Sequence, residues 1–281
     1  MADLLRMLTC SVHPLPYHPD PAHYFAAIRH APGAVLLDSG RPVADRGRYD
    51  LLSAWPIEAF AVQPEESGHV FLQRLRGALK HLGNAELPPP YELPFVGGLI
   101  GYLSYDFGRQ LEHLPAQSLN DLQLPDARLG LYAWALVSDH HAATSQLVFH
   151  PRLADTERER LIELFTQPVS PETRAFSLKH PMQPDISVEY YQHALQKIQH
   201  YIQAGDCYQV NYTQRFSAPC EGDPWTAYCA LRAACPTPFS GFISLPEDTA
   251  ILSLSPERFV HVSNNQVETR PIKGTRPRGK D

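Results

Sequence analysis

Lys273 has a setting that suits covalent chemistry. It lies in the stretch "RPIKGTRPRG", after a Pro271-Ile272 pair and before Gly274. Proline restricts the backbone before the lysine, and glycine leaves room for a ligand to approach. A lysine that is held in this way and partly desolvated can lose its proton and act as a nucleophile or a base. A solvated lysine at the end of a strand is the alternative, which these residues alone leave open.

Glu257 is the second candidate for chemistry. It lies in "ILSLSPERF", where a predicted strand ends and another predicted strand begins at Phe259. A carboxyl group at such a break can act as a general acid, which gives its proton to a departing oxygen. The alternative is a structural ion pair with Arg258 or another arginine.

The composition is that of an ordinary globular protein. The chain has 281 residues, of which 43% are hydrophobic and 19% are charged, and its net charge of −6 argues against nucleic-acid binding. The five cysteines lack metal spacing and are odd in number, so we expect a reducing cytoplasm and neither a disulfide framework nor a zinc site. The sequence shows no secretory signal, and its longest apolar run, residues 129–137, is too short to cross a membrane.

Apolar periodicity and turn residues predict an α+β fold with large mixed or antiparallel sheets. The predicted domains are residues 1–165, a proline-rich linker over 166–184, and a second domain over 185–281. Helices are expected over 69–84, 155–165, 187–205 and 223–234. Strands are expected over 33–40, 50–64 (as a pair), 127–150 (as a hairpin), 208–216, 239–245, 250–253 and 259–262.

Two patterns could be mistaken for ligand sites. The glycines of "FVGGLIGYLSYDFGR" lack the spacing of a dinucleotide-binding loop, so we expect them to allow close sheet packing. His193 and His200 are seven residues apart on one predicted helix, and we expect solvated or packed side chains there, not a metal site.

Three motifs together resemble a known family. "DCYQVNYTQRF", "ILSLSPERF" and "TRPIKGT", in this order, are similar to segments of the chorismate-utilising enzymes. These are the large subunits of anthranilate synthase and aminodeoxychorismate synthase, and the isochorismate synthases are related enzymes. "LLDSG", "GYLSYDFGR" and "LPDARLGLYAWALVSDHH" extend the resemblance to the first half. It implies sheets packed as a sandwich with flanking helices, as in anthranilate synthase component I.

The lysine indicates the branch of this family. Anthranilate synthases have alanine between the Pro-Ile and Gly-Thr pairs, whereas aminodeoxychorismate synthases have lysine, as here. The resemblance therefore implies conversion of chorismate and ammonia to 4-amino-4-deoxychorismate, the precursor of 4-aminobenzoate in folate synthesis. In that reaction Lys273 is the nucleophile, Glu257 is the proton donor, and Gly274 and Thr275 contact the substrate.

The resemblance also implies Mg²⁺ as cofactor and a separate glutaminase subunit that supplies the ammonia. Family chains continue well past the lysine motif, and the metal ligands are expected in that later part, with none in this sequence. We therefore expect a fragment whose second domain is incomplete, with exposed strand edges and no turnover by itself.

A tryptophan pocket is the last implication of the resemblance. Its predicted residues are Ser39, Arg46, Gly47, Arg48, Tyr49, Pro238, Phe239 and Ser240. Arg46 and Gly47 are less typical of the pocket, and Ser39 could simply end a strand in a turn. Two alternative functions stay open, namely anthranilate synthase component I and a non-catalytic tryptophan-binding module.

Overall fold

The computed structural model describes residues 8–44, 47–115, 120–168 and 174–272. It contains two compact units, one formed by Met1–Pro171 with Tyr228–Asp281 and one by Glu172–Ala227. The first unit contains both sheets described next, and we describe each unit by itself.

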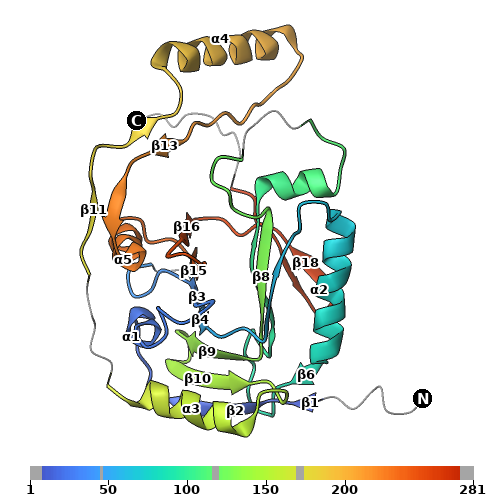
Figure 1. Ribbon diagram of the computed structural model, residues 1–281, viewed down its shortest axis with the longest axis vertical. Coiled ribbons are helices and arrows are strands. Elements are labelled where there is room, and N and C mark those ends of the chain that lie inside the picture. Colours follow the sequence, from blue (N-terminus) through green and yellow to red (C-terminus); the bar gives the residue numbers. More distant parts are fainter. Residues whose placement is uncertain (1–7, 45–46, 116–119, 169–173, 273–281) are drawn as a thin grey trace, which may run out of the picture. The chain divides into compact units, whose positions relative to one another are not determined.

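A seven-stranded antiparallel sheet organises the first unit (Figure 1), in the order β16-β15-β3-β4-β9-β10-β2. Every strand of this sheet pairs antiparallel to its neighbour, which agrees with the predicted mixed or antiparallel sheets. The strands are β2 (Ser11–Leu15), β3 (Val35–Asp38), β4 (Tyr49–Ser53), β9 (Trp134–Asp139), β10 (Thr144–Phe149), β15 (Phe239–Ser244) and β16 (Ala250–Ser255).

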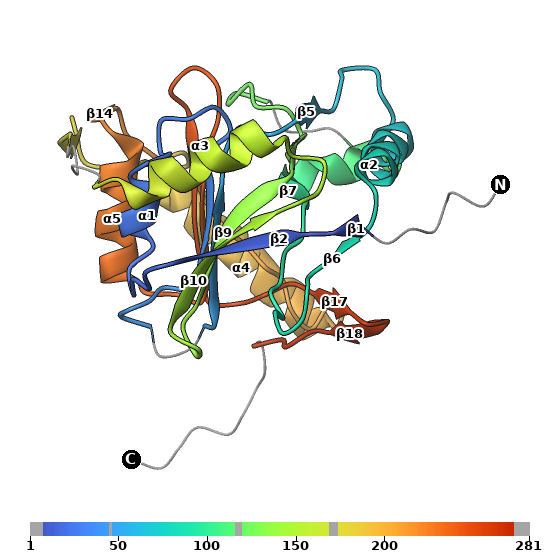
Figure 2. The same ribbon diagram turned by 90° about the horizontal axis from the view of Figure 1, so that it is seen from below.

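One face of this sheet carries a row of large apolar side chains at directly opposed positions. The residues of the row are all buried, and the row crosses five strands: Phe242, Leu36, Leu52, Leu136 and Leu147. Because strand side chains alternate between faces, one register fixes the whole row. The helices α1 (Ala22–Phe25) and α3 (Asp155–Thr166) and the end of α5 (Pro224–Ala234) lie beside this sheet (Figure 2).

Aromatic rings join the helices to the sheet. The ring of Phe25 in α1 lies 5.7 Å from that of Phe242, and Tyr228 in α5 lies 5.6 Å from the same ring. Phe165 in α3 meets Trp134 of β9 with ring centroids 5.8 Å apart. Such edge and tilted pairs stabilise beyond the burial of their area, so these rings fix where the helices lie.

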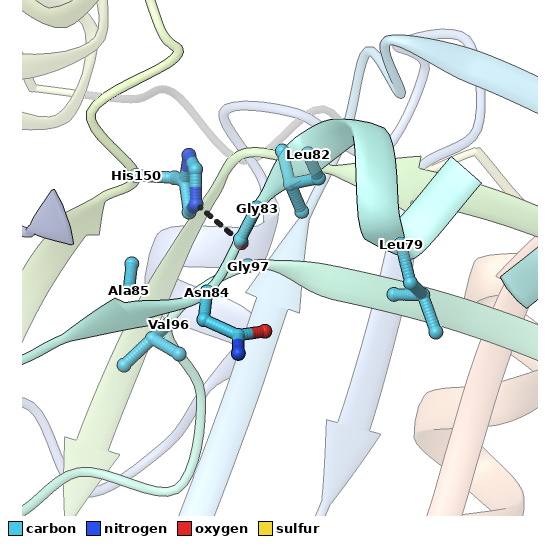
Figure 3. A pocket seen from close by; sticks show the side chains of 8 residues that line it. All are labelled: Leu79, Leu82, Gly83, Asn84, Ala85, Val96, Gly97 and His150. Carbon is cyan, nitrogen blue, oxygen red and sulfur yellow. Dashed lines mark hydrogen bonds between the residues drawn. The ribbon is translucent and has the colours of Figure 1, made fainter. Parts of the chain in front are cut away.

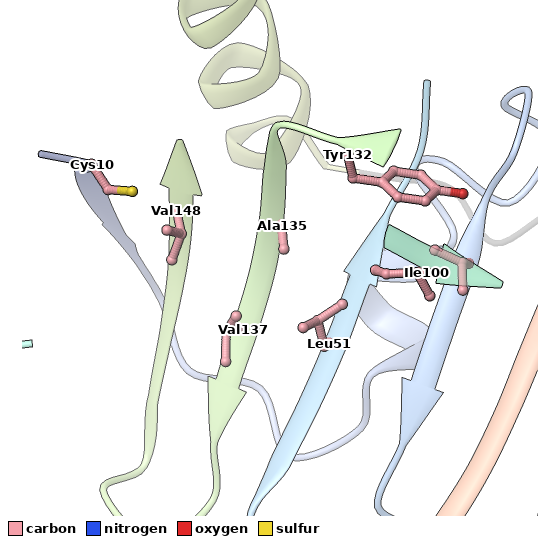
Figure 4. Close-up of a cluster of buried hydrophobic side chains, with 8 residues drawn as sticks. Cys10, Leu51, Ile100, Tyr132, Ala135, Val137 and Val148 are labelled. Atoms are coloured by element: carbon pink, nitrogen blue, oxygen red, sulfur yellow. The ribbon is translucent and has the colours of Figure 1, made fainter. Parts of the chain in front are cut away.

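The other face of the sheet packs against a smaller sheet, in the order β5-β8-β7. Its strands are β5 (Glu58–Ala61), β7 (Gly98–Leu103) and β8 (Ala127–Tyr132). Ile100 and Tyr132 of the small sheet share one buried cluster with Leu51 and Val137 of the large sheet (Figure 4). The predicted sandwich with flanking helices is therefore the fold of this unit.

Helix α2 (Gly68–Leu82) covers the small sheet from outside. The hydroxyl of Ser67 caps it by accepting a bond from the Val70 amide at 3.3 Å, and Gly83 ends it at a φ of +86°. Phe71 and Leu75 turn toward the sheet and are buried. A 3₁₀ helix, η1 (Tyr105–Gln110), follows β7, and β1 (Leu8–Thr9) pairs in parallel with β6 (Ala85–Glu86).

Gly101 confirms the packing role expected for the glycine-rich stretch. A Cβ atom at this position of β7 would lie 2.1 Å from the carbonyl oxygen of Arg128 in β8. No side chain fits there without backbone movement, so glycine allows the two strands to approach.

The second unit contains the long helix α4 (Val188–Ala204). The hydroxyl of Ser187 caps it, as predicted, and Gly205 ends it in the left-handed conformation. Two short ladders accompany it, β11 (Phe176–Leu178) with β14 (Cys220–Gly222) and β12 (Gln183–Pro184) with β13 (Phe216–Ser217). His193 and His200 are exposed, and no group of three metal-ligating side chains occurs among the described residues.

The strand predicted over residues 208–216 is wrong, except at its end. Only Phe216–Ser217 is extended in a ladder, with Gln183–Pro184 as partner. The alternating pattern is present, but a strand also needs a neighbour for its backbone groups. Residues 208–215 pair with no strand in the described part of the chain.

The sheet crosses the predicted domain boundary. β15 and β16 follow the expected linker in sequence, yet β15 pairs with β3 from the beginning of the chain. The hairpin of β17 (His261–Ser263) and β18 (Gln266–Glu268) comes next. Among the helices of the described ranges, none has the length and apolar character that a membrane crossing needs.

Candidate active site

Glu257 lies just after β16, in a turn closed by the hydroxyl of Ser255. That hydroxyl donates to the Glu257 carbonyl at 2.8 Å and accepts from the Glu257 amide at 3.2 Å. Serine makes such local bonds readily and so ends the strand. The turn leaves Glu257 half-buried, outside the ladder.

The Glu257 carboxylate meets the segment that leads to the predicted nucleophile. Its Oε1 atom accepts a hydrogen bond of 3.1 Å from the backbone amide of Ile272. Ile272 is the residue immediately before Lys273. Lys273, Gly274 and Thr275 lie outside the described residues, so the predicted contact between the amine and the carboxyl stays a prediction.

Ser39 begins the turn that follows β3, and an aspartate fixes it. The amide and the hydroxyl of Ser39 each donate to Oδ1 of Asp50 at 2.7 Å. Nε2 of His140 lies 2.7 Å from the other oxygen of Asp50, and Nδ1 of His140 lies 2.9 Å from the hydroxyl of Tyr17. Ser39 and Asp50 are both 2% exposed, so this is a buried polar network with its groups paired.

The two halves of the predicted tryptophan pocket are neighbours in the sheet. Ser240 of β15 is directly opposite Asp38 of β3, one residue before Ser39. Ser240 is buried and its hydroxyl lies 2.6 Å from that of Thr237, whereas Phe239 is 40% exposed and Pro238 is half-buried. The structure therefore brings Ser39 and Pro238–Ser240 together, and tryptophan binding at this place stays a prediction.

The segment predicted to close the pocket is described from Gly47 onward, and Arg46 lies outside the described residues. A Cβ atom on Gly47 would lie 2.6 Å from Cβ of Ser39, so the segment does pass over the Ser39 turn. Arg48 forms an ion pair with Asp139 at 2.8 Å, and its guanidinium lies 4.6 Å from the ring centre of Tyr49. Burial by itself would raise the pKa of Asp139. The hydrogen bonds from Arg48 and from two backbone amides outweigh this effect, so the pKa of Asp139 is lowered.

Asp38 is a buried charge that the sequence analysis missed. Its side chain is fully buried and accepts from Nε of Arg232 at 2.6 Å and from the hydroxyl of Tyr228 at 2.9 Å. Arg232 also contacts Asp20 at 3.0 Å and the carbonyl of Arg41 at 2.7 Å. Burial lowers the pKa of Arg232, yet Asp38 more than compensates and raises it. Nothing in "LLDSG" indicates this partner, since Arg232 is almost 200 residues away.

The hollow drawn in Figure 3 is a different site, of about 420 Å³. It lies at the end of α2 and is lined by Leu79, Leu82, Gly83, Asn84, Ala85, Val96, Gly97 and His150. His150 contacts the Gly83 carbonyl through Nε2 at 3.3 Å and accepts the Arg152 amide through Nδ1 at 3.1 Å. Among the predicted site residues that the structure describes, none lines this hollow.

Comparison with known proteins identifies the family. The chorismate binding enzyme family matches residues 34–281. The chain is 38% identical to aminodeoxychorismate synthase component 1 of Salmonella typhimurium, over 99% of this chain and 62% of that protein. The Escherichia coli protein of the same name is also 38% identical, over 98% of this chain and 62% of its own length. This chain belongs to the chorismate binding enzymes.

Two further comparisons concern anthranilate synthase component 1. The Thermus thermophilus protein of that name is 37% identical over 67% of this chain and 41% of its own length. The crystal structure of anthranilate synthase component I from Streptococcus pneumoniae superposes with a TM-score of 0.62 at 20% identity, over 80% of this chain and 54% of that one. That likeness establishes the α+β fold. The chain spans about 62% of the length of the first curated relatives.

Proposed function

We propose that this chain is part of a chorismate aminase, the large subunit that converts chorismate and ammonia to 4-amino-4-deoxychorismate. The 38% identity to proteins named aminodeoxychorismate synthase component 1 supports this choice within the family. So does the lysine of "TRPIKGT", which stands against the anthranilate synthase alternative. The observation that carries the chemistry is the bond from the Ile272 amide to the Glu257 carboxylate, one residue before that lysine.

The proposed reaction has two displacements. The uncharged amine of Lys273 bonds to C2 of the ring, and both ring double bonds shift, from C1=C2 to C1=C6 and from C5=C6 to C4=C5. The C4–O bond breaks as Glu257 gives its proton to the departing hydroxyl, which leaves as water. Ammonia then bonds to C4, both ring double bonds shift back, and the C2–N bond to Lys273 breaks. The proton that ammonia loses restores the carboxylic acid, so the sum is chorismate plus ammonia to product plus water.

The cofactor and the partners are also part of the proposal. Mg²⁺ would neutralise a substrate carboxylate when bound. No set of three suitable ligands exists among the described residues, so the expectation of Mg²⁺ rests on the family resemblance and no step here depends on it.

The name "component 1" of the relatives supports a second component, for which we propose a glutaminase that supplies ammonia. Tryptophan at the Ser39 turn is a further proposal, supported by the adjacency of Ser39 and Pro238–Ser240.

Product analysis tests the proposal in the whole gene product, including any sequence that follows Asp281. With chorismate, ammonia and Mg²⁺ we expect 4-amino-4-deoxychorismate without anthranilate or pyruvate. Glu257→Gln should lower kcat by about 10²- to 10⁴-fold, the usual contribution of a general acid. Glu247→Gln, in the exposed β15–β16 turn, is the matched control and should not change kcat.

Lys273→Ala is the sharper variant. It should abolish the amination, and mass spectrometry of the wild-type enzyme, quenched during turnover, should find a covalent adduct on Lys273. Release of anthranilate and pyruvate by the wild type would instead favour the alternative that the protein is anthranilate synthase component I. Tryptophan binding that survives Lys273→Ala, with no reaction of chorismate in any variant, would favour the non-catalytic module.

A further inference from the structure

The segment that carries Glu257 is held by side chains. Residues 256–260 connect β16 to β17 and belong to neither strand, so ladder hydrogen bonds do not fix them. A general acid must nevertheless be held close to its productive geometry, because a displacement of about 1 Å can cost about 10²-fold in rate. The groups that fix this segment therefore matter for any chemistry at Glu257.

Arg258 touches two different elements from within this segment. Its guanidinium carbon lies 5.5 Å from the ring centre of Phe239 in β15, and its Nη2 atom is paired with Oε1 of Glu268 in β18. Phe239 belongs to the seven-stranded sheet, and Glu268 ends the hairpin that leads to Ile272. A planar guanidinium can stack on a ring and bind a carboxylate at once, which an ammonium group cannot do as well.

The segment follows the register of the hairpin although it is outside the ladder. In β17 and β18, His261 is opposite Glu268. If this register is continued by four residues, Glu257 is opposite Ile272, which is the pair joined by the 3.1 Å bond. The hydroxyl of Thr269 adds a bond of 3.1 Å to the carbonyl of Phe259. The contacts of Arg258, Glu257 and Thr269 thus replace ladder bonds over this stretch.

We propose that Arg258 is a positioning residue. By bridging Phe239 and Glu268, it holds the Glu257 carboxylate at the Ile272 amide and so sets where the proton donor meets the substrate. The inference rests on the proposed function for its kinetic test only, since its structural test needs no substrate.

Arg258→Gln tests the inference, and Arg270→Gln is the matched control. Arg270→Gln removes the same charge, and Arg270 also binds Glu268, at 3.0 Å. Its side chain is 80% exposed, and it lies over no aromatic ring of the described ranges. We expect amide hydrogen exchange at Ile272, followed by NMR, to become several-fold faster in Arg258→Gln and to stay near wild type in Arg270→Gln. In the whole gene product, Arg258→Gln should lower kcat about tenfold at nearly constant KM, less than removal of the acid itself.

Arg258→Lys separates the charge from the guanidinium group. Lysine keeps a charge that can pair with Glu268 but lacks the guanidinium that lies over the Phe239 ring, so the kcat of this variant should fall between those of wild type and Arg258→Gln. Equal exchange at Ile272 in Arg258→Gln and Arg270→Gln would overturn the inference. A wild-type enzyme that does not aminate chorismate would overturn the proposed function instead, while the exchange measurement would still decide the role of Arg258.

Discussion

Asp38 and Arg232 form a buried ion pair in which each charge depends on the other. The Asp38 side chain is fully buried, and that of Arg232 is 11% exposed. Removal of one partner leaves the other charged and desolvated, which costs about 3–5 kcal/mol. We therefore expect Arg232→Met to lower the free energy of unfolding by about that amount in urea titrations. Arg76→Met, at an exposed position of α2, should stay within about 0.5 kcal/mol of wild type, and an equal effect of the two variants would contradict this account.

His150 makes stability depend on pH. His150 is 1% exposed, and burial lowers the pKa of its imidazole below the ordinary value of 6.5. Its neutral form satisfies both nitrogens, because Nε2 donates to the Gly83 carbonyl while Nδ1 accepts the Arg152 amide. Protonation would remove that acceptor, so the folded state resists it while the unfolded state does not.

The sign of the pH effect follows from linkage. Because the folded pKa of His150 is lowered, the unfolded state binds more protons, and stability falls as pH drops from the unfolded value of 6.5 toward the folded value. His150→Gln, which has a donor and an acceptor but does not titrate here, should flatten that part of the profile. Unfolding free energies measured between about pH 5 and 8 check this, and parallel profiles of wild type and variant would refute it.

At the scale of elements, Gly101 tests how closely β7 and β8 pack. Alanine there would place Cβ 2.1 Å from the Arg128 carbonyl oxygen, so the backbone must shift. We expect Gly101→Ala to destabilise by about 1–3 kcal/mol, the usual cost of overpacking. Gly77→Ala is the control, because a Cβ atom in that turn of α2 meets nothing within 4 Å. Gly77→Ala should raise the free energy of unfolding by about 0.5–1 kcal/mol. If Gly101→Ala proved more stable than Gly77→Ala in urea titrations, the packing argument would be wrong.

Elements with strong local signals could be predicted from the sequence. Ser187 and Gly205 mark the ends of α4 in the sequence as they do in the structure, because caps are local chemistry. The stretch 208–216 shows the limit, since its alternation is local but its missing partner strand is not. The site divides in the same way. Glu257 could be singled out from its motif, whereas Arg258 looked like its ion-pair partner and in fact binds Glu268.

At the scale of the molecule, the two units differ in how much they bury. α4 contains no buried residue, whereas the centre of the large sheet is closed on both faces. Local opening is easiest where few apolar contacts hold an element. Hydrogen exchange in this chain should therefore be fastest, among the regular elements longer than ten residues, in α4. Slower exchange in α4 than in α2 would contradict this expectation.

The pairing of β15 with β3 has a consequence for synthesis. Asp38 leaves the ribosome about 200 residues before Ser240, its neighbour in the sheet. At about 5–20 residues per second, the edge of β3 waits roughly 10–40 s for its partner. During that interval the nascent chain exposes the unpaired backbone amides of β3 next to the leucines of the buried row. Other chains can pair with such an edge and aggregate. When many ribosomes translate the same mRNA, the supply of chaperones should therefore limit the yield of folded protein more than the stability of the folded state does.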